Sequence, residues 1–459
     1  MSDTQVFLDT IKTVPDFFAQ EAPIFVTRAP GRLDVMGGIA DYSGSLVLQL
    51  PIADATHVAL QKSDKSQLHI RSLGTGGDTR SLELDLSKLN SISSYDSARE
   101  VFSDTANHWA TYVAGVFPVL VIEKGVQFKG GAAILISSSV PEGKGVSSSA
   151  ALEVSVMQAV NVAFDLKLEC RELGSLCQKV ENMVAGAPCG IMDQMTSACG
   201  EENRLLELLC QPDILKGTLP LPADLELWGI DSGVRHSVSG SDYGTVRTAA
   251  FMGYRMIADA ARLPVKTVAT NKVQIDDSRW HGYLANISPD EFESEFAPLL
   301  SERVNGSDFL DRYQGITDTI TSVQHGVEYP VLQATRHPIY EHARVKKFAR
   351  ILKDSPDTDQ GHALGPLMFE SHQSYSDCGL GSEATDLIVD LVRDLSDDGL
   401  YGARITGGGS GGTVAVLGRR GSSAAIEKLR ERFQAQTGYL PVVISGSSAG
   451  ARVFDHLLR

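Results

Sequence analysis

The stretch PEGKGVSSSAALE, Pro141–Glu153, decides the fold, because it joins an expected strand at 132–137 to an expected helix at 148–164. Its glycines let the backbone approach an anion closely, and the amides that open the helix present about half a positive charge. A serine hydroxyl can also donate to phosphate or bind Mg²⁺. The stretch therefore predicts a phosphate-binding loop, and a helix cap without a ligand is the alternative. Its spacing matches neither G-x-x-x-x-G-K-[ST] nor G-x-G-x-x-G.

A second glycine cluster, TGGGSGG at Thr406–Gly412, lies between expected strands at 403–405 and 413–417. It contains the pattern G-x-S-x-G of a hydrolase nucleophile, but that pattern requires a helix after the serine, and a strand follows here. The hydrolase interpretation therefore fails. A tight turn and a ligand-binding loop both remain open for this cluster.

Two further segments combine charged residues with tight glycine turns. The first is RAPGRLDVMGGIADY, Arg28–Tyr42, and the second is GAPCGIMDQ, Gly186–Gln194. Arginine and aspartate beside such turns suit a polyol-binding pocket in which a carboxylate lies next to a cation. Surface turns with solvated charges are the alternative for either segment alone.

The 459 residues include 41 Lys and Arg against 57 Asp and Glu, which gives a net charge of −16. Nucleic acid and anionic membranes attract proteins with a positive field, so this balance argues against both as partners. The six cysteines show no C-x-x-C spacing, so we expect reduced thiols. No secretory signal or bilayer-spanning run is visible, and we expect a cytoplasmic protein.

Short β-rich runs dominate the first part of the chain and are followed by helices, so the expected fold class is α+β with a mostly antiparallel first sheet. Three prolines and a glycine within 210–224 indicate a domain boundary. We therefore predict two domains, 1–215 and 216–459. The segment 267–331 fits neither pattern and is expected to be folded in part.

A helix is expected at 338–352, with Pro338 in its first turn. We predict that His337 and His342 are helix-start and surface residues, because their spacing excludes an i,i+4 zinc pair. Glu341 and Arg344 are spaced i,i+3 and are predicted to lie on a solvated face of this helix.

Taken together and in this order, the four segments resemble the GHMP kinases, and specifically the galactokinase branch. Members carry P-G-R-V-N-L-I-G-E-H-T-D-Y near the start, P-x-G-x-G-x-S-S-S-A in the middle, P-C-G-I-M-D-Q soon after and T-G-G-G-x-G-G near the end. The resemblance covers essentially the whole chain. It implies a two-domain GHMP kinase fold, with an N-terminal ribosomal-protein-S5-domain-2-like domain and a C-terminal ferredoxin-like α/β plait domain.

The resemblance also implies where ATP and Mg²⁺ bind. Adenine is expected against Trp109 of WATYVAG, and an ordinary core aromatic is the alternative for this residue. Mg²⁺ is expected on Ser148 and Glu181. Lys144 replaces a residue that is usually small or apolar, so it is either an additional phosphate contact or a solvated surface charge. The expected phosphate contacts are Gly143, Lys144, Gly145, Ser147, Ser148 and Ser149.

For the sugar, the resemblance implies that Arg32 and Asp193 are the catalytic pair, in which Asp193 takes or orients the proton of the anomeric hydroxyl. Tyr243 follows a segment in which Asp231 and Gly233 replace asparagines of the family, and a core tyrosine is the alternative for it. The expected substrate contacts are Gly38, Ile39, Asp41, Cys189, Gly190 and Tyr243.

Gly38 and Ile39 replace the Glu-His pair of galactokinases, which lies beside the exocyclic hydroxymethyl group of galactose. L-Arabinopyranose shares the ring stereochemistry of galactose but lacks that group, and a buried hydroxyl without a partner costs about 1–3 kcal/mol. The stretches 32–48, 280–288 and 335–341 are also similar to the kinase region of plant L-arabinokinases. The resemblance therefore implies an ATP- and Mg²⁺-dependent kinase that forms β-L-arabinose 1-phosphate.

Two alternatives remain open. A galactokinase would perform the same chemistry, and a non-catalytic sensor would bind the same sugar and ATP. The intact serine loop, together with Glu181, Arg32 and Asp193, favours an enzyme over a sensor. The expected partners are a small sugar and ATP, without nucleic acid or membrane, and the expected assembly is a monomer or a weak homodimer.

Overall fold

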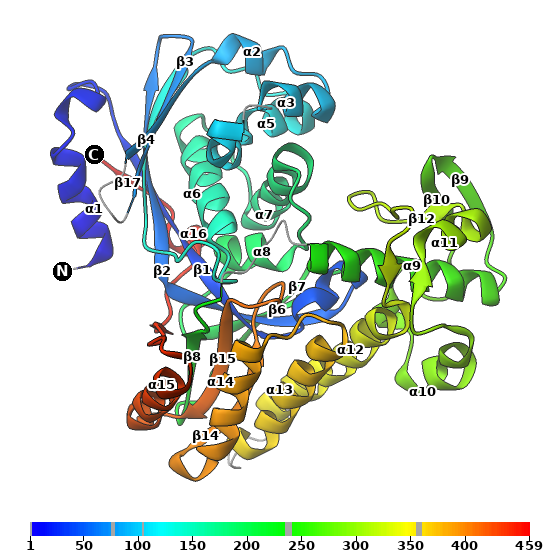
Figure 1. Cartoon of the computed structure of the whole chain (residues 1–459). Helices are drawn as coiled ribbons and strands as arrows, with labels where there is room; N and C mark the ends of the chain where they lie inside the picture. Colours follow the sequence, from blue (N-terminus) through cyan, green and yellow to red (C-terminus); the bar gives the residue numbers. More distant parts are fainter. Residues whose placement is uncertain (1, 75–78, 103–104, 235–240, 355–359) are drawn as a thin grey trace.

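The computed structural model of the chain describes residues 2–74, 79–102, 105–234, 241–354 and 360–459. Figure 1 shows an N-terminal sheet with helices beside it, a second sheet below it built from residues 225–231 and the last part of the chain, and a small lobe of the middle segment that projects to one side. None of the helices in these described ranges is long and apolar enough to cross a membrane.

The N-terminal sheet has eight strands, in the order β17-β1-β2-β5-β3-β4, and β6 pairs with β2 while β7 pairs with β6. Its neighbours are antiparallel except for β3 and β5, which confirms the expected, mostly antiparallel sheet. The strand β2 continues without a break from Leu46 to Ser63, because β1 pairs with it on both sides of a register shift between Pro30 and Arg32. The strands are β1 Phe25–Met36, β2 Leu46–Ser63, β3 Gln67–Leu73, β4 Thr79–Asp85, β5 Gly131–Ser138, β6 Arg204–Leu209, β7 Ile214–Pro220 and β17 Leu457–Leu458.

Helices cover one face of this sheet, and α1 (Asp3–Lys12) lies on the other face (Figure 1). The central helix, α6, carries apolar side chains all round and is buried almost throughout, together with a few polar groups such as Glu153, because sheet and helices surround it. The segment 105–124 is divided into a 3₁₀ turn at 105–110 and two α-helices. The helices are α4 Thr111–Ala114, α5 Val116–Lys124, α6 Ser148–Ala163, α7 Cys170–Lys179 and α8 Met192–Cys199.

The second sheet has the order β14-β15-β8-β16 and is antiparallel throughout. One crossover connects β8 to β14, and α15 connects β15 to β16, so the chain follows the β-α-β-β-α-β path of a ferredoxin-like plait. This confirms the expected α+β fold class and the C-terminal plait. The elements are β8 Leu225–Asp231, β14 Leu400–Ile405, β15 Thr413–Arg419, β16 Val443–Ser445, α13 Gln360–Asp377, α14 Glu383–Asp394 and α15 Ser423–Thr437.

The expected boundary at residue 215 falls inside β7, which pairs with β6 as far as Pro220. The chain changes sheets between Pro220 and Leu225, where β8 begins. The end of the chain then returns to the first sheet, because β17 pairs with β1. The division into domains 1–215 and 216–459 stays a prediction, and the strand pairing places the change of sheet a few residues later.

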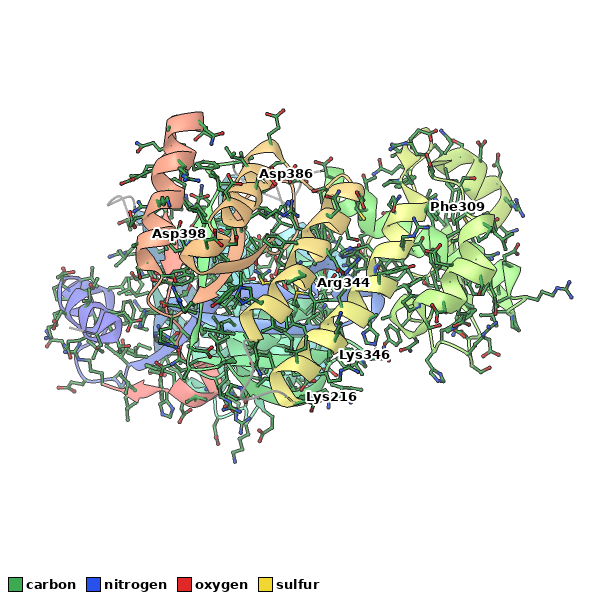
Figure 2. All side chains as sticks on the ribbon, turned by 90° about the horizontal axis from the view of Figure 1, so that it is seen from below. Lys216, Phe309, Arg344, Lys346, Asp386 and Asp398 are labelled. Atoms are coloured by element: carbon green, nitrogen blue, oxygen red, sulfur yellow. The ribbon has the colours of Figure 1, made fainter. Side chains whose placement is uncertain are left out.

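The middle segment forms the projecting lobe around an apolar cluster that includes Trp280, Phe292 and Phe309 and continues into the body at Ile39 and Tyr375. Figure 2 shows Phe309 in this lobe, away from Arg344 on α12. The lobe is joined to the body through α9 and α12. Its elements are α9 Ser241–Ala260, β9 Val265–Ala269, β10 Asn271–Ile275, α10 Pro289–Glu291, β11 Val304–Asn305, α11 Gly306–Tyr313, β12 Gly315–Ile316, β13 Glu328–Tyr329 and α12 Val331–Asp354.

The prediction of a solvated face on the helix at 338–352 is wrong. Glu341 is fully buried, and His337 and His342 are buried as well. The reason is that α12 packs against α9, α13 and the turn after β1. Glu341 Oε1 accepts hydrogen bonds from the amide of Gly37 at 3.0 Å and from Ser371 Oγ at 2.7 Å. A helix that was expected to face solvent therefore supports the segment that begins at Arg28.

Candidate active site

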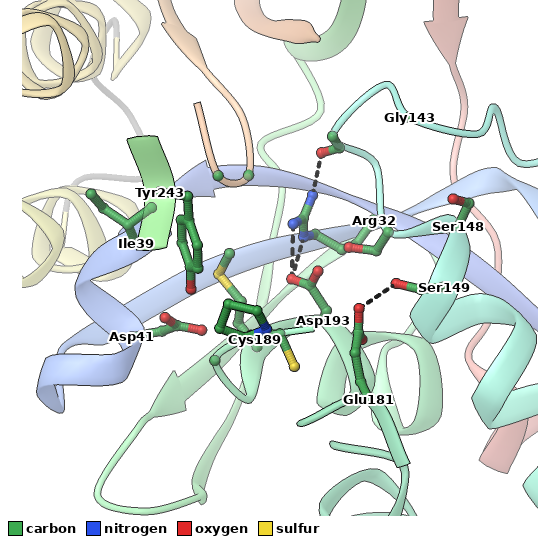
Figure 3. A pocket seen from close by; sticks show the side chains of 17 residues that line it. Arg32, Ile39, Asp41, Gly143, Ser148, Ser149, Glu181, Cys189, Asp193 and Tyr243 are labelled. Atoms are coloured by element: carbon green, nitrogen blue, oxygen red, sulfur yellow. Dashed lines mark hydrogen bonds and ion pairs between the residues drawn. The ribbon is translucent and has the colours of Figure 1, made fainter. Parts of the chain in front are cut away.

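Three of the four motif segments and the opening of α9 meet at one pocket (Figure 3), and the fourth motif, the glycine cluster of the second sheet, closes it from the opposite side. Its lining residues come from β1 and its following turn, the serine loop, the η4 to α8 connection, α9 and the second glycine cluster. They are Arg32, Ile39, Asp41, Gly143, Gly145, Ser147, Ser148, Ser149, Glu181, Pro188, Cys189, Gly190, Met192, Asp193, Tyr243, Gly407 and Gly408.

Arg32 and Asp193 form a close ion pair in this pocket (Figure 3). Arg32 Nε and Nη2 lie 2.9 and 2.8 Å from Asp193 Oδ1, and Arg32 Nη1 donates to the carbonyl of Gly145 at 2.6 Å. The Asp193 side chain is 19% exposed, whereas that of Arg32 is 3% exposed. The buried guanidinium therefore links the serine loop to a carboxylate that opens into the pocket.

The serine loop presents backbone amides instead of capping its own helix. Gly143, Gly145 and Ser147 have left-handed backbone conformations, with φ of 69°, 72° and 63°. Alternating left-handed residues turn successive N–H groups toward a common concavity, which is an arrangement that binds anions. Ser147 is the N-cap of α6, yet its hydroxyl makes no capping hydrogen bond and has no partner among the described residues. The first amides of α6 are thus left for a ligand.

The second glycine cluster packs directly against the serine loop. A Cβ on Gly407 would lie 2.8 Å from the carbonyl oxygen of Gly145, and a Cβ on Gly145 would lie 3.1 Å from that of Thr406. Thr413 Oγ1 also donates to the carbonyl of Lys144 at 2.8 Å. Of the two interpretations that the sequence left open for this cluster, the position of Gly407 in the pocket wall favours a ligand-binding loop.

Lys144 does not reach the pocket. Its Nζ lies 2.9 Å from Asp231 Oδ2 on β8, and Tyr439 Oη donates to the same oxygen at 2.6 Å. Asp231 is buried, and a buried carboxylate requires a cation or donors. The ammonium group therefore compensates Asp231, a role that neither sequence interpretation of Lys144 described, and a phosphate contact at this position stays a prediction.

Glu181 lies in the π-helical turn η4, Val180–Ala185, and its buried carboxyl group faces the serine loop. Ser149 Oγ donates to its Oε1 at 2.9 Å, and Gln194 Nε2 donates to its Oε2 at 2.7 Å (Figure 3 shows the first contact). Burial, and then the charge of Asp193, raise the pKa of Glu181 to about 7. A hydroxyl beside a buried carboxylate is a donor set that suits Mg²⁺.

Asp41 lies on the opposite side of the pocket. Its Oδ2 is buried and has no hydrogen-bond partner among the described residues. Burial, and then repulsion by Asp193, raise the pKa of Asp41 to about 7. Gly190 allows this approach, because a Cβ there would lie 1.6 Å from Asp41 Oδ2. An unpaired, buried carboxylate oxygen in a pocket wall is suited to accept a hydrogen bond from a ligand hydroxyl.

The remaining expected sugar contacts divide into two groups. Ile39, Cys189 and Tyr243 line the pocket, and Tyr243 is buried with its ring edge-on to Tyr42. Gly38 does not line the pocket. A side chain at this position would point toward Tyr375 and Arg404, which lie outside the pocket lining. The expectation that residue 38 contacts the sugar is therefore not supported by its placement.

Trp109 lies outside the pocket lining and packs, half-buried, against the N-terminal core. This is the arrangement that the core alternative describes. A contact between Trp109 and adenine stays a prediction.

No sequence pattern indicates one charged pair that supports the sugar side of the pocket. Arg247 Nε and Nη2 bind Asp318 at 2.8 and 2.9 Å, and Arg247 Nη1 donates to the carbonyl of Cys189 at 3.0 Å. Both side chains are buried. The pair connects the projecting lobe to the loop that precedes Asp193, and only the packing of α9 against that lobe reveals it.

Family comparisons agree with this arrangement. The GHMP kinases N terminal domain matches residues 111–201, the GHMP kinases C terminal domain matches 359–435, and the galactokinase galactose-binding signature matches 16–62. A galactokinase of Chloroflexus aggregans is 30% identical over 89% of this chain and 88% of its own length. The chain belongs to the GHMP kinase family.

Among its relatives, an Arabidopsis thaliana L-arabinokinase is 45% identical over 97% of this chain, which spans 48% of the length of that relative. The structure of Lactococcus lactis galactokinase complexed with galactose superposes with a TM-score of 0.73 at 22% identity, covering 97% of this chain and 99% of that one. A mevalonate kinase structure superposes with a TM-score of 0.53 at 14% identity, over 93% and 99%. These structures show that the GHMP kinase fold is shared.

Proposed function

We propose that this GHMP kinase is an ATP-dependent sugar 1-kinase that phosphorylates the anomeric hydroxyl of L-arabinose, giving β-L-arabinose 1-phosphate and ADP. The observation on which the substrate rests is the apolar pocket wall at Ile39, which is 1% exposed and lies near the unpaired Oδ2 of Asp41. Ile39 offers no hydrogen bond to a hydroxymethyl group, whereas Asp41 can accept one from a ring hydroxyl. The 45% identity to an L-arabinokinase supports the same choice.

The proposed reaction uses Asp193 and Arg32. The anomeric oxygen attacks the γ-phosphorus of ATP, the bond from that phosphorus to the bridging oxygen breaks, and the electron pair leaves with ADP. Arg32 holds Asp193 Oδ1, so we assign the hydroxyl proton to Oδ2. Arg32 also binds the serine loop through Gly145, which keeps its positive charge beside the transferred group.

Glu181, with Ser148 or Ser149, would hold Mg²⁺ in this proposal. Mg²⁺ usually binds one or two carboxylates plus phosphate oxygens of the substrate. The proposed site therefore needs no larger group of protein ligands. In the described residues, no group of three or more His, Cys, Asp or Glu side chains is arranged to hold a metal. When bound, the ion neutralises charge on the phosphate oxygens. The hydrogen bond from Ser149 to Glu181 fixes the carboxylate toward that position.

The experiment that tests this function is a panel of pentoses and hexoses with ADP release as the readout. We expect release with L-arabinose, and kcat/KM for L-arabinose above that for D-galactose. NMR of the product checks that the phosphate is attached to the anomeric oxygen at C1. Release of ADP with galactose alone would contradict the substrate assignment, and no release with any sugar would contradict the enzyme assignment.

A galactokinase is the second candidate, and the galactose-binding signature at 16–62 is the observation that favours it. The single change Ile39→His tests the wall directly, since it restores a hydrogen-bonding side chain at this position. We expect it to lower the preference for L-arabinose over D-galactose. We further propose a cytoplasmic location, in keeping with six free cysteines. We also propose that the protein is a monomer or a weak homodimer, and analytical sedimentation measures this oligomeric state.

A further inference from the structure

Position 38 has no room for a side chain, and the obstacle is Tyr375. Gly38 has a left-handed backbone with φ of +49°. A Cβ added to it would lie 1.8 Å from Tyr375 Oη, 2.7 Å from Arg404 Nη2 and 2.8 Å from Asp34 Oδ2. Carbon atoms do not approach an oxygen to 1.8 Å without a bond, so any side chain at 38 requires Tyr375 to move.

Tyr375 is fully buried on α13, and its hydroxyl makes two hydrogen bonds to the pocket walls. Tyr375 Oη accepts from the amide of Ile39 at 2.8 Å and donates to the carbonyl of Gly407 at 2.9 Å. Ile39 and Gly407 both line the pocket. One hydroxyl thus joins the apolar wall to the second glycine cluster.

Two buried side chains pack against the ring of Tyr375, so its hydroxyl has little freedom to shift. The guanidinium carbon of Arg404 lies 5.1 Å from the ring centre, and the His337 ring packs edge-on at 5.1 Å. Arg404 is itself fixed by Asp34, with Nη1 to Oδ2 at 2.7 Å and both side chains fully buried. Asp34 Oδ1 accepts in turn from the amide of Gly38 at 3.1 Å, which closes the unit.

We propose that Tyr375 is a positioning residue that sets sugar specificity, because its hydroxyl occupies the space of a side chain at position 38 and directs Ile39 into the pocket. The Tyr375 hydroxyl then explains both the absence of a side chain at position 38 and the placement of Ile39 in the pocket wall. The sugar that benefits from this wall rests on the proposed function. The coupling between positions 38 and 375 does not.

The test is a double-mutant cycle of Gly38→Ala and Tyr375→Phe, with Tyr254→Phe as the matched control. Tyr254 is also buried, and its hydroxyl donates to Asp277 at 2.6 Å in the projecting lobe. Tyr375→Phe leaves the amide of Ile39 unpaired, so we expect KM for L-arabinose to rise by about tenfold and the ratio of kcat/KM for L-arabinose over D-galactose to fall. Tyr254→Phe should leave that ratio unchanged.

Gly38→Ala should be far more harmful in the wild-type background than in the Tyr375→Phe background, because the phenylalanine lacks the oxygen that the new methyl group meets. The same comparison made by thermal unfolding needs no sugar, so it reports on the coupling even if the proposed substrate is wrong. Equal penalties for Gly38→Ala in both backgrounds would overturn the proposal. So would an unchanged sugar ratio in Tyr375→Phe, measured with whichever sugars the wild-type enzyme accepts.

Discussion

The ammonium group of Lys144 lies 2.9 Å from the buried carboxylate of Asp231, and this contact joins the serine loop to the second sheet. Lys144 and Asp231 each depart from the family pattern, and their pairing gives both departures one explanation. The Lys144 side chain is 20% exposed and that of Asp231 is 4% exposed, so the pair is largely removed from water.

Replacing Lys144 by Met should therefore destabilise the protein more than it weakens ATP binding. Asp231 would be left without its cation, and we expect the free energy of unfolding to fall by about 1–3 kcal/mol in urea titrations. Adding Asp231→Asn should recover much of the loss, since the neutral amide does not require a cation. A large rise in KM for ATP with unchanged stability would instead make Lys144 a phosphate contact.

Asp193→Asn should lower kcat by about 10²–10⁴, the usual effect of losing a positioned base. The amide keeps the shape of the side chain but cannot accept the proton, and its bond to Arg32 loses its charge. KM for ATP should change little, because Arg32 still reaches the carbonyl of Gly145. Steady-state kinetics with ADP detection checks this, and a variant that kept more than about a tenth of the turnover would remove Asp193 from that role.

Glu181→Gln should abolish activity yet stabilise the ligand-free protein at alkaline pH. Burial raises the pKa of Glu181 in the folded state to about 7, above its ordinary value of 4.5. As pH rises between these values, the unfolded chain releases the proton before the folded one does, so the wild-type protein loses stability, by about 3 kcal/mol at most above pH 7.

The variant lacks this titration, so its melting temperature should exceed that of the wild type at pH 8, with the difference shrinking toward pH 4. Thermal unfolding across this range measures it, and Glu431→Gln on the exposed surface of α15 is the control. A difference that stayed constant with pH would contradict the assignment of the raised pKa.

Gly190→Ala should weaken sugar binding, because its methyl group would lie 1.6 Å from Asp41 Oδ2 and displace that carboxylate. An overpacked site costs about 1–3 kcal/mol, so KM for the sugar should rise by about 5- to 150-fold. Gly244→Ala on α9 is the matched control, since nothing lies within 4 Å of its added carbon. Equal KM values for the two variants would show that Asp41 does not contact the sugar.

The sequence alone established the fold class and predicted which segments form the site, because the chemistry of those segments depends on local properties. Glycine turns, helix N-termini and the order of strand, loop and helix depend on residues that are adjacent in the sequence. The expected site residues Arg32, Asp41, Glu181 and Asp193 all line one pocket. Periodicity located many helices and strands for the same reason, but not their exact ends, since α12 begins at Val331 and not at Pro338.

Only the tertiary structure decided what each charged or missing side chain does. Lys144 meets Asp231, Glu341 meets Gly37, and Gly38 meets Tyr375, and each pair joins residues about 90 to 340 positions apart in the chain. Local pattern cannot distinguish a solvated charge from a buried one, because burial depends on which distant element packs on it. The partner of each group therefore became visible only when the sheets, α12 and α13 were placed against one another.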